Sequence, residues 1–381
     1  MKTFVVTGGT GFLGSHLGLR LLEEGNRVVF LTRNKGHIQA KERIEESLRG
    51  LKNEIPNHQN VSVIEQDLKE PISPDLFKNE KIDGVWHCAA NLSFKKKNRL
   101  TIFKDNVGGL KNILDLVTNL DCPVFYVSTA YVHGKSPHGI VQYEKESMAR
   151  KFNNPYEESK AIAERNLVEW GRENKNKFII FRPSILVEDM LHRKVKTPFG
   201  YYAVLWSVHK LKESLEHFYK KHTFLSKLLF VRKNRDTIFA PLIFPYNKDV
   251  TLNLMPISIA LGWITILSQK ADSLGKIFHI TNKNPHTMKE ITEKTLQTLE
   301  LELLTFQAPS FFITLYYRMI MMGGFFIKPL RILAKTLHYY GFYMTHSVRY
   351  NQQNILNSGV SQGTVFGNDF LGKVIALFLQ K

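Results

Sequence analysis

The chain has 381 residues, with 52 Lys and Arg against 34 Asp and Glu, a formal net charge of +18, and only two cysteines. This length suffices for one large α/β domain with additions, or for two domains. Two cysteines argue against a disulfide framework and fit a reducing, cytoplasmic setting, and a first predicted strand at Thr3 leaves no room for a signal peptide ahead of it.

The chain opens on a strand, a glycine turn and a helix, which is the context of a phosphate-binding site. Thr3–Thr7 is short, β-branched and apolar, and it predicts a buried strand. Gly8 then permits a tight turn, Gly11 lets a pyrophosphate approach the backbone, and Gly14 lets the helix pack closely on the strand. The apolar spacing of Ser15–Glu24 predicts that helix. An ordinary βα turn that needs glycine is the alternative.

The second predicted strand, Arg27–Thr32, ends at a basic residue, Arg33. An acidic residue at this place holds the ribose hydroxyls of NAD, whereas a basic one suits the 2′-phosphate of NADP(H). Lys35 and Arg43 follow closely. The alternative is that these are solvated charges on a predicted helix Lys41–Leu51, but Arg33 leaves the carboxyl end of a strand, where ligands bind. We therefore expect NADP(H).

Strand-length apolar runs alternate with helical segments through the rest of the chain. This alternation predicts the α/β class, with a Rossmann-type, doubly wound parallel sheet. Further strands are expected at Val61–Glu65, Gly84–Cys88, Pro123–Val127, Phe178–Phe181 and Ile277–Ile280, and helices at Val107–Leu120, Tyr156–Asn174, Ile257–Ser268 and Met288–Leu299.

Three parts of the chain are expected. Residues 1–190 form an NADP-binding Rossmann domain that carries the catalytic residues. Residues 191–300 supply substrate-binding segments packed on that domain, and residues 301–381 form an apolar, helical C-terminal region that contacts an acyl chain or a membrane. The last two together make a smaller, mostly helical part.

Tyr156 and Lys160 stand four residues apart at the start of a predicted helix, so they share one face of it. A phenol has a pKa of about 10, and a nearby ammonium lowers that pKa and makes proton transfer useful at neutral pH. The strand ending at Val127 releases Ser128 and Thr129, and either hydroxyl can stabilise a substrate oxygen at the carboxyl end of the sheet. A surface Tyr–Lys pair is the alternative.

Two later segments are unusual in composition. From 191 to 250, 12 Lys and Arg stand against 4 Asp and Glu, among many aromatic residues. This composition fits an anionic membrane surface or an acidic ligand such as coenzyme A; no nucleic-acid module is recognisable. Phe311–Ile327 is the most apolar run, but Arg318 interrupts it and it is shorter than a comfortable membrane span. We expect an interfacial helical hairpin or a substrate lid within 311–345, with a buried helix pair as the alternative.

A set of motifs resembles the extended short-chain dehydrogenase/reductase family in order and spacing, from residue 1 to about 190. Within that family, HCAANLSF, VSTAYV and FRPSIL are similar to fatty acyl-CoA reductases and thioester-reductase domains. LNLMPISIALGWITIL (252–267) and GKIFHITNKNPHTMKEI (275–291) resemble their later region, and HSVRYNQQNILNSG (346–359) resembles its end. The family motifs are TGGTGFLG (7–14), Asp67-Leu68, HCAA (87–90), NVGG (106–109), VSTAYVHG (127–134), YEESK (156–160) and FRPSI (181–185).

This resemblance implies the roles of the site residues. Thr129 is the oxyanion partner, Tyr156 is the general acid, and Lys160 tunes Tyr156 and binds the nicotinamide ribose. Arg33 and Arg43 take the 2′-phosphate of NADP(H). Cofactor contacts are implied for Gly8, Thr10, Gly11, Phe12, Leu13, Gly14, Arg33, Arg43, Asp67, Leu68, Ala89, Ala90, Asn106, Lys160 and Pro183.

Some residues depart from this pattern or have simpler interpretations. Pro256-Ile257-Ser258 stands where such enzymes usually carry Pro-Val-Asp, which puts a local contact in doubt. His87 is expected in the core or the wall of the site, and Cys88 in the core, because no His/Asp arrangement makes it a nucleophile. The fourteen histidines show no ligand spacing backed by cysteines or carboxylates, so no metal is expected.

The expected function is NADPH-dependent reduction of a long-chain acyl thioester, carried by coenzyme A or an acyl carrier protein, to an aldehyde, an alcohol or both. The expected location is cytoplasmic, with peripheral attachment to an anionic membrane surface. The alternatives are a reductase or dehydrogenase of a hydrophobic keto or hydroxy lipid, an enzyme like the sugar-nucleotide epimerases and dehydratases, and an NADPH-binding regulatory protein without turnover.

Overall fold

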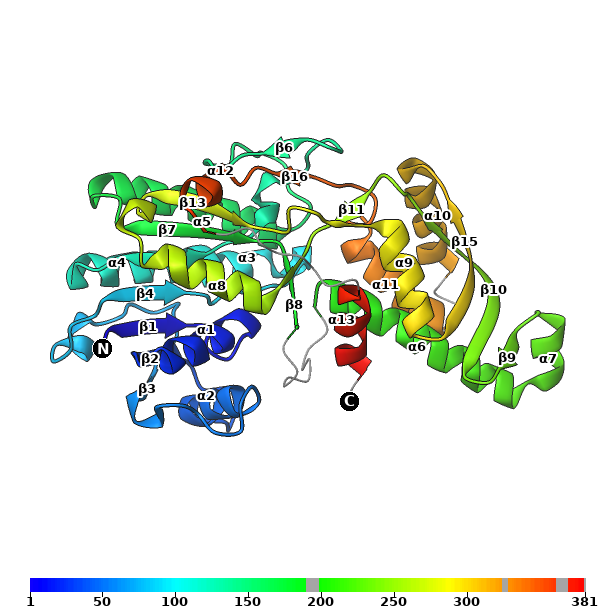
Figure 1. Cartoon of the computed structure of the whole chain (residues 1–381), viewed down its shortest axis with the longest axis horizontal. Helices are drawn as coiled ribbons and strands as arrows, with labels where there is room; N and C mark the ends of the chain where they lie inside the picture. Colours follow the sequence, from blue (N-terminus) through cyan, green and yellow to red (C-terminus); the bar gives the residue numbers. More distant parts are fainter. Residues whose placement is uncertain (190–198, 324–327, 361–368, 380–381) are drawn as a thin grey trace.

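The computed structural model describes residues 1–189, 199–323, 328–360 and 369–379, and its elements form two parts that lie side by side (Figure 1). The Rossmann part contains a seven-stranded sheet in the order β13-β7-β5-β4-β1-β2-β3, with every neighbouring pair parallel. Its strands are β1 (Thr3–Thr7), β2 (Arg27–Thr32), β3 (Val61–Glu65), β4 (Gly84–His87), β5 (Val124–Val127), β7 (Phe178–Pro183) and β13 (Lys276–Ile280).

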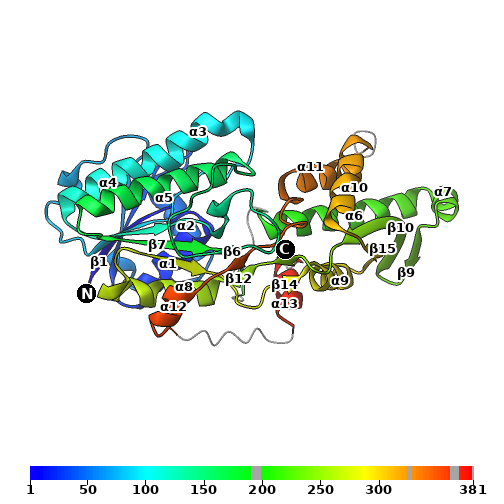
Figure 2. The ribbon, with the colours of Figure 1, turned by 90° about the horizontal axis from the view of Figure 1, so that it is seen from above.

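Helices cover both faces of this sheet, as a parallel sheet requires (Figure 2). One core cluster joins the sheet to α1, α2 and α8, through side chains such as Leu17, Ile44 and Ile264. The other joins it to α4 and α5, through Ile113 and Leu167. The helices are α1 (Phe12–Glu23), α2 (Ala40–Arg49), α3 (Arg99–Phe103), α4 (Gly109–Leu120), α5 (Pro155–Glu173), α8 (Ile257–Ser268) and α12 (Gln353–Asn357).

The predicted doubly wound sheet is confirmed, and its elements differ from prediction by only a few residues at their ends. The strands could be predicted from the sequence because both of their faces are buried, which makes each strand uniformly apolar. The strands β5 and β7 show this. The strand order reverses between β1 and β4, so the glycine turn after β1 lies at the switch point where a dinucleotide binds.

The second part packs around its own apolar core, which includes Leu205, Ile238, Leu301 and Val374. It is mostly helical, but it also contains a three-stranded sheet in the order β15-β10-β9 that the sequence did not predict. Its elements are α6 (Tyr201–Lys221), α7 (Thr223–Leu228), β9 (Arg232–Asn234), β10 (Thr237–Tyr246), α9 (Met288–Thr298), β15 (Leu301–Gln307), α10 (Ser310–Gly323), α11 (Lys328–Tyr340) and α13 (Phe370–Leu379).

Two prolines explain why β10, the central strand of this small sheet, was not predicted from the sequence. Pro241 and Pro245 interrupt TIFAPLIFPY, and proline within an apolar run argues against a strand because it cannot donate to the ladder. The structure accommodates Pro241 where the register between β10 and β15 shifts, between Phe239 and Ile243. A bulge of this kind takes a residue out of the pairing, so the proline does not end the strand.

The chain crosses between the two parts several times. β8 (Ile185–Val187) pairs with β12 (Leu254–Pro256), and α8 and β13 then return to the large sheet. Near the end of the chain, β16 (Arg349–Tyr350) pairs with β6 (Val141–Gln142), and α12 packs beside β13. The remaining short pair joins β11 (Thr251–Leu252) to β14 (His286–Thr287).

The unusual residue Ser258 lies in the first turn of α8. Its backbone N–H donates to Asp189 Oδ1 at 3.1 Å, and its hydroxyl donates to Asp189 Oδ2. A carboxylate therefore still meets the N-terminus of this helix, where negative charge is favourable. It comes from the loop after β8 rather than from the Pro-Ile-Ser segment, so the missing acidic residue is replaced from elsewhere in the chain.

The apolar segment expected to form a hairpin contains α10 and α11, which pack against each other, and α11 also packs against α6. Residues 324–327 between them lie outside the described residues. α10 exposes Phe311, Phe312, Met319 and Met322. Over the described parts of the chain, no helix is both long and apolar enough to cross a membrane.

Candidate active site

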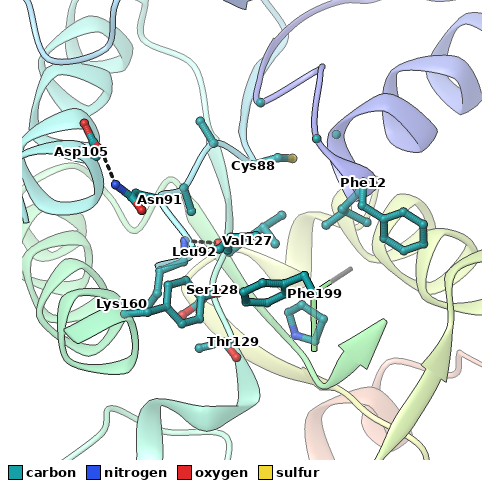
Figure 3. Close-up of a pocket in the computed structure, with 18 of the residues that line it drawn as sticks. Phe12, Cys88, Asn91, Leu92, Asp105, Val127, Ser128, Thr129, Lys160 and Phe199 are labelled. Atoms are coloured by element: carbon teal, nitrogen blue, oxygen red, sulfur yellow. Dashed lines mark hydrogen bonds between the residues drawn. The ribbon is translucent and has the colours of Figure 1, made fainter. Parts of the chain in front are cut away.

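A cavity of about 730 Å³ opens at the carboxyl ends of the large sheet and extends to the second part (Figure 3). Six strands of the sheet, β1, β2, β3, β4, β5 and β7, end at it, and segments around residues 199 and 340 also line it. The predicted site residues that line it are Gly8, Thr10, Gly11, Phe12, Leu13, Gly14, Arg33, Arg43, Asp67, Leu68, Ala89, Ala90, Thr129, Tyr156, Lys160 and Pro183.

The glycine turn after β1 is shaped so that a side chain does not fit. Gly8 has φ of +73°, and a Cβ there would lie 2.6 Å from the backbone nitrogen of Ala89. A Cβ on Gly14 would lie 2.3 Å from the carbonyl oxygen of Gly8. Gly11 is the N-cap of α1 and gives no side-chain cap, so the helix N-terminus faces the cavity with backbone N–H groups available to an anion. The turn therefore fits the pyrophosphate of a dinucleotide.

Two arginines border the adenosine end of the cavity. The Arg43 guanidinium donates to the Arg33 carbonyl oxygen and lies 3.4 Å from Thr10 Oγ1. Arg33 Nη1 lies 3.4 Å from Asp67 Oδ2, with more than half of the arginine side chain exposed. Both guanidinium groups border a second hollow that adjoins the cavity. The loop after β2 and the helix α2 thus place two guanidinium groups at this end of the cavity.

Tyr156 and Thr129 meet at the centre of the cavity. Asn154 caps α5 by accepting from Glu157 N–H at 3.0 Å, so the helix begins at Pro155 and places Tyr156 in its first turn. Thr129 follows β5, and its hydroxyl accepts from Tyr131 N–H at 3.3 Å. A hydrogen bond with Thr129 lowers the pKa of Tyr156, but burial dominates and raises that pKa well above its ordinary value. The phenol is therefore protonated at neutral pH.

Lys160 is buried one turn further along α5. Its ammonium donates to the Val127 carbonyl oxygen at 2.6 Å and to the Tyr126 hydroxyl at 3.1 Å, and it lies over the Tyr126 ring. Burial lowers its pKa from 10.5 to about 7, partly offset by Glu164. The predicted effect of Lys160 on Tyr156 does not appear in this geometry, because the ammonium is directed at the end of β5 rather than at the phenol.

A buried ion pair fixes α5 against the sheet. Arg182, from the FRPS motif at the end of β7, donates Nε to Glu164 at 2.9 Å and Nη2 to the same carboxylate at 2.5 Å. Both side chains are almost completely buried. Such a bidentate pair sets the position and rotation of the helix that carries Tyr156 and Lys160.

The assignment of Asn106 to the cofactor needs correction. Its side chain is buried and does not line the cavity. Its amide accepts from the backbone N–H of Asn91 at 2.7 Å and donates to Ser159 Oγ at 2.9 Å, so it joins α5 to the loop after β4. The residue that this arrangement presents to the cavity is Asn91, whose side-chain amide donates to Asp105 at 2.7 Å (Figure 3).

Cys88 and His87 have different environments although they are adjacent. His87 is buried, as predicted, and pairs with Thr7 Oγ1 at 2.9 Å; burial lowers its pKa to about 3. Cys88, predicted in the core, is partly buried and packs against the core cluster of the sheet, and it also lines the cavity (Figure 3). Burial raises the pKa of its thiol to about 12, so it is not a nucleophile at neutral pH.

Aromatic side chains that the motifs did not identify form the wall of the cavity beside Tyr156. Phe94 stacks on Tyr156 with ring centroids 6.0 Å apart, and it also contacts Phe199, Tyr340 and Tyr343. Phe94 comes from the loop after β4, Phe199 from just before α6, Tyr340 from the last position of α11, and Tyr343 from the turn that follows α11. Phe94 lies in a motif stretch, but the others carry no sequence signal, because only the fold brings them together.

The second part is connected to α5 through a buried carboxylate, that of Glu157. Tyr343 donates its hydroxyl to Glu157, the neighbour of Tyr156, and accepts from Asn154 Nδ2 at 2.9 Å. Asn153 donates its backbone N–H to the same carboxylate at 2.9 Å. Burial raises the pKa of Glu157 from 4.5 to about 7 despite these donors.

We expect Glu157→Gln to raise the free energy of unfolding above that of the wild type, and to raise it more at pH 8 than at pH 5. The folded pKa is above the unfolded one, so wild-type stability falls as pH rises from 4.5 to 7, and the whole penalty is present above pH 7. Gln keeps an acceptor for Tyr343 without the charge. At 1.36 kcal/mol per pKa unit, the gain should be about 2 kcal/mol larger at pH 8 than at pH 5. Denaturant unfolding at both pH values measures it; an equal effect at both would contradict a buried, titrating carboxylate.

The described residues hold no group of three or more His, Cys, Asp and Glu side chains placed to bind a metal ion.

Comparison with known proteins gives three kinds of similarity. The profile of a family described as male sterility protein, an NAD-binding family, matches residues 6–222. Human dTDP-D-glucose 4,6-dehydratase is 32% identical over 189 residues, which cover 48% of this chain and 51% of that protein. UDP-glucose 4-epimerase uge1 of Schizosaccharomyces pombe is 30% identical over 180 residues, covering 46% of this chain and 48% of that protein. The chain thus spans about half the length of the curated relatives it matches.

Among solved structures, the terminal R domain from the myxalamid PKS-NRPS biosynthetic pathway matches with a TM-score of 0.74 at 19% identity, covering 100% of this chain and 90% of that one. A dTDP-glucose 4,6-dehydratase from Bacillus anthracis in complex with NAD matches with a TM-score of 0.62 at 15% identity, covering 100% and 97%. At such identities these likenesses show the fold, including that of the second part.

Proposed function

The chain belongs to the NAD-binding family described as male sterility protein, and from this premise we propose that it reduces a long-chain acyl thioester with NADPH. It is an extended short-chain dehydrogenase/reductase, and thus an NAD(P)-dependent oxidoreductase. The observation that carries the proposal is the position of Thr129 and Tyr156. Their hydroxyls meet beside a wall of aromatic rings, next to the glycine turn that fits a dinucleotide.

The wall beside Tyr156 favours an apolar acyl group over a sugar nucleotide. A sugar nucleotide needs cations for its diphosphate and polar groups for its hydroxyls, whereas this wall is built from Phe94, Phe199, Tyr340 and Tyr343. Glu157, the residue next to Tyr156 in the sequence, is acidic, but its carboxylate already accepts hydrogen bonds from the Tyr343 hydroxyl and the Asn153 backbone N–H. The fold of the whole chain is similar to that of a terminal R domain from a PKS-NRPS biosynthetic pathway.

The residues of the site would act on the carbonyl group of the thioester. When bound, the nicotinamide supplies a hydride to the carbonyl carbon. Thr129 donates a hydrogen bond to the carbonyl oxygen as negative charge builds there, and Tyr156 transfers its proton to that oxygen. Collapse of the resulting hemithioacetal breaks the C–S bond, releases a free thiol and leaves an aldehyde. Lys160 holds the ribose of the cofactor and the end of β5. A second reduction in the same site gives an alcohol.

A direct test follows NADPH oxidation and free thiol together, using purified protein and a long-chain acyl-CoA. The proposal requires that thiol appears as NADPH disappears. NADPH oxidation with hydrophobic ketones, without thiol release from any thioester, would instead identify a keto-lipid reductase. Tight cofactor binding without turnover on either substrate would indicate a regulatory protein.

We expect Arg33→Ala to weaken NADPH binding by about tenfold or more while changing the affinity for NADH little. A charge-assisted contact with a phosphate contributes about 1.5–3 kcal/mol, and the 2′-phosphate is the only group that distinguishes the two cofactors. Fluorescence titration with each cofactor measures the ratio of dissociation constants. Lys41→Ala is a matched control from the same surface, since Lys41 is exposed and lines neither the cavity nor the adjoining hollow. Equal loss for both cofactors would contradict the assignment of Arg33 to the 2′-phosphate.

A further inference from the structure

The far end of the second part exposes a cluster of large apolar side chains. We call residues 220–236, which contain the end of α6, α7 and β9, the distal tip. Figures 1 and 2 both show α7 at the end of the molecule furthest from the large sheet. Five consecutive or near-consecutive apolar residues of the tip are exposed: Phe224 by 79%, Leu225 by 43%, Leu228 by 62%, Leu229 by 53% and Phe230 by 60%. Scattered apolar residues are normal on a surface, but a contiguous group marks an interaction site.

The backbone holds one of these side chains outward in an unfavourable conformation. α7 ends with Phe230 N–H bonded to the Lys227 carbonyl at 3.2 Å and Val231 N–H bonded to the Ser226 carbonyl at 2.8 Å. This arrangement puts Phe230 in the left-handed region, with φ of +55°, at a position that glycine usually occupies. A bulky aromatic residue that is both strained and exposed is unexpected if the tip serves only to close the fold.

The apolar cluster lies among basic side chains. Lys220, Lys221, Lys227, Arg232 and Arg235 are exposed, and in the part of the chain that the structure describes none of them is joined to a carboxylate. Lys233 is paired with Glu216 at 3.5 Å. Asp236 is the one acidic residue of the tip sequence. The surface that surrounds the apolar residues therefore carries a strong positive charge.

The basic residues of the tip are separated from the cavity by the length of α6. Gly200, the N-cap of this helix, and Phe199 just before it line the cavity, whereas the tip begins at Lys220 in the last turn of the helix. A helix of 21 residues is about 30 Å long, at 1.5 Å per residue. This distance separates the tip from the reacting carbonyl group, so binding at the tip is a separate event from catalysis.

We propose that the distal tip docks on an anionic lipid membrane. Phenylalanine and leucine side chains favour the boundary between headgroups and acyl chains, and lysine and arginine around them favour anionic lipid headgroups. The tip combines both features, and the charge complementarity selects lipid over an apolar protein partner. Docking here leaves the large sheet at the opposite end of the molecule (Figure 1). The inference stands apart from the proposed reaction, since it does not depend on the substrate.

Vesicle cosedimentation tests this proposal with the purified 381-residue chain. The protein should sediment with phosphatidylcholine vesicles that contain phosphatidylserine, sediment much less with phosphatidylcholine alone, and be released by high salt. The double variant Phe224→Ser/Leu228→Ser should bind at least ten times more weakly. The matched control is Leu100→Ser/Met148→Ser, which removes two side chains exposed by 83% and 81% on the Rossmann part and should bind like the wild type.

Phe230→Gly keeps the test informative if the double variant folds poorly. Glycine relieves the strain at φ of +55°, so this variant should unfold at a higher temperature and yet bind vesicles more weakly. Absence of sedimentation with either vesicle would overturn the proposal, as would equal binding by tip and control variants. A dimer of the wild type that Phe224→Ser/Leu228→Ser converts to a monomer, without vesicles, would show that the tip binds a second copy instead.

Discussion

Tyr156→Phe is expected to reduce turnover by a factor of about 10² to 10⁴ while the protein still folds and binds NADPH. The loss follows from removing the proton donor, since general acid catalysis by a positioned side chain is of this size. Burial raises the pKa of this phenol, so its proton is present at neutral pH. Phenylalanine keeps the ring that stacks on Phe94, so packing should change little.

The measurement is NADPH oxidation with a long-chain acyl-CoA, together with cofactor affinity and melting temperature. Tyr201→Phe is a suitable control, because Tyr201 is another buried tyrosine whose hydroxyl bonds to a threonine, Thr295 at 3.1 Å, but in the core of the second part. That variant should keep its activity. If Tyr156→Phe retained more than a tenth of the wild-type rate, the proton would have to come from another group, and the role of Thr129 and Tyr156 would need revision.

Lys160→Met is expected to abolish most of the activity and at the same time to stabilise the protein. Methionine fills a similar volume, but it cannot hold the ribose or the end of β5, and we expect a loss of about hundredfold or more in turnover, as for the removal of other preorganised donors. The stability change has the opposite sign because burial of the ammonium is unfavourable and lowers its pKa from 10.5 to about 7.

The pH dependence of that stabilisation has a definite sign. Between pH 7 and 10.5 the unfolded chain binds the proton that the folded chain has lost, so wild-type stability rises with pH through this window. The burial penalty is complete below pH 7 and absent above 10.5. The advantage of Lys160→Met over wild type should therefore be largest below pH 7 and shrink as the pH is raised. Unfolding curves at several pH values measure it; an advantage that grew with pH would contradict a buried, destabilising lysine.

Glu157 and Tyr343 suggest how the two parts of the molecule act together. Tyr343 lies after α11 and reaches the residue next to Tyr156, while Asn154 both caps α5 and donates to Tyr343. These hydrogen bonds therefore join the second part directly to the first turn of α5. The aromatic wall couples the parts in the same way, because Phe94 contacts rings from both.

The sequence by itself determined the Rossmann part and the centre of its site. The strands could be recognised because both faces of a parallel sheet are buried, which makes each strand an apolar run. Gly8 and Gly14 could be assigned because the turn after β1 leaves no room for a Cβ, and this requirement is local to a few residues. Tyr156 and Lys160 are four residues apart in one helix, so their common face also follows from local geometry.

Only the tertiary structure decided which groups surround those residues. Tyr340 and Tyr343 meet Phe94 across more than two hundred positions of sequence, and no local pattern records such a contact. Asn106 belongs to a recognisable motif, yet only the fold shows that it holds Asn91 rather than a ligand. The ammonium of Lys160 turns to Val127 because β5 ends there, whereas spacing along the helix specifies a face and not a partner. Local sequence determines helices, strands and turns, while contacts between distant segments depend on how those elements pack.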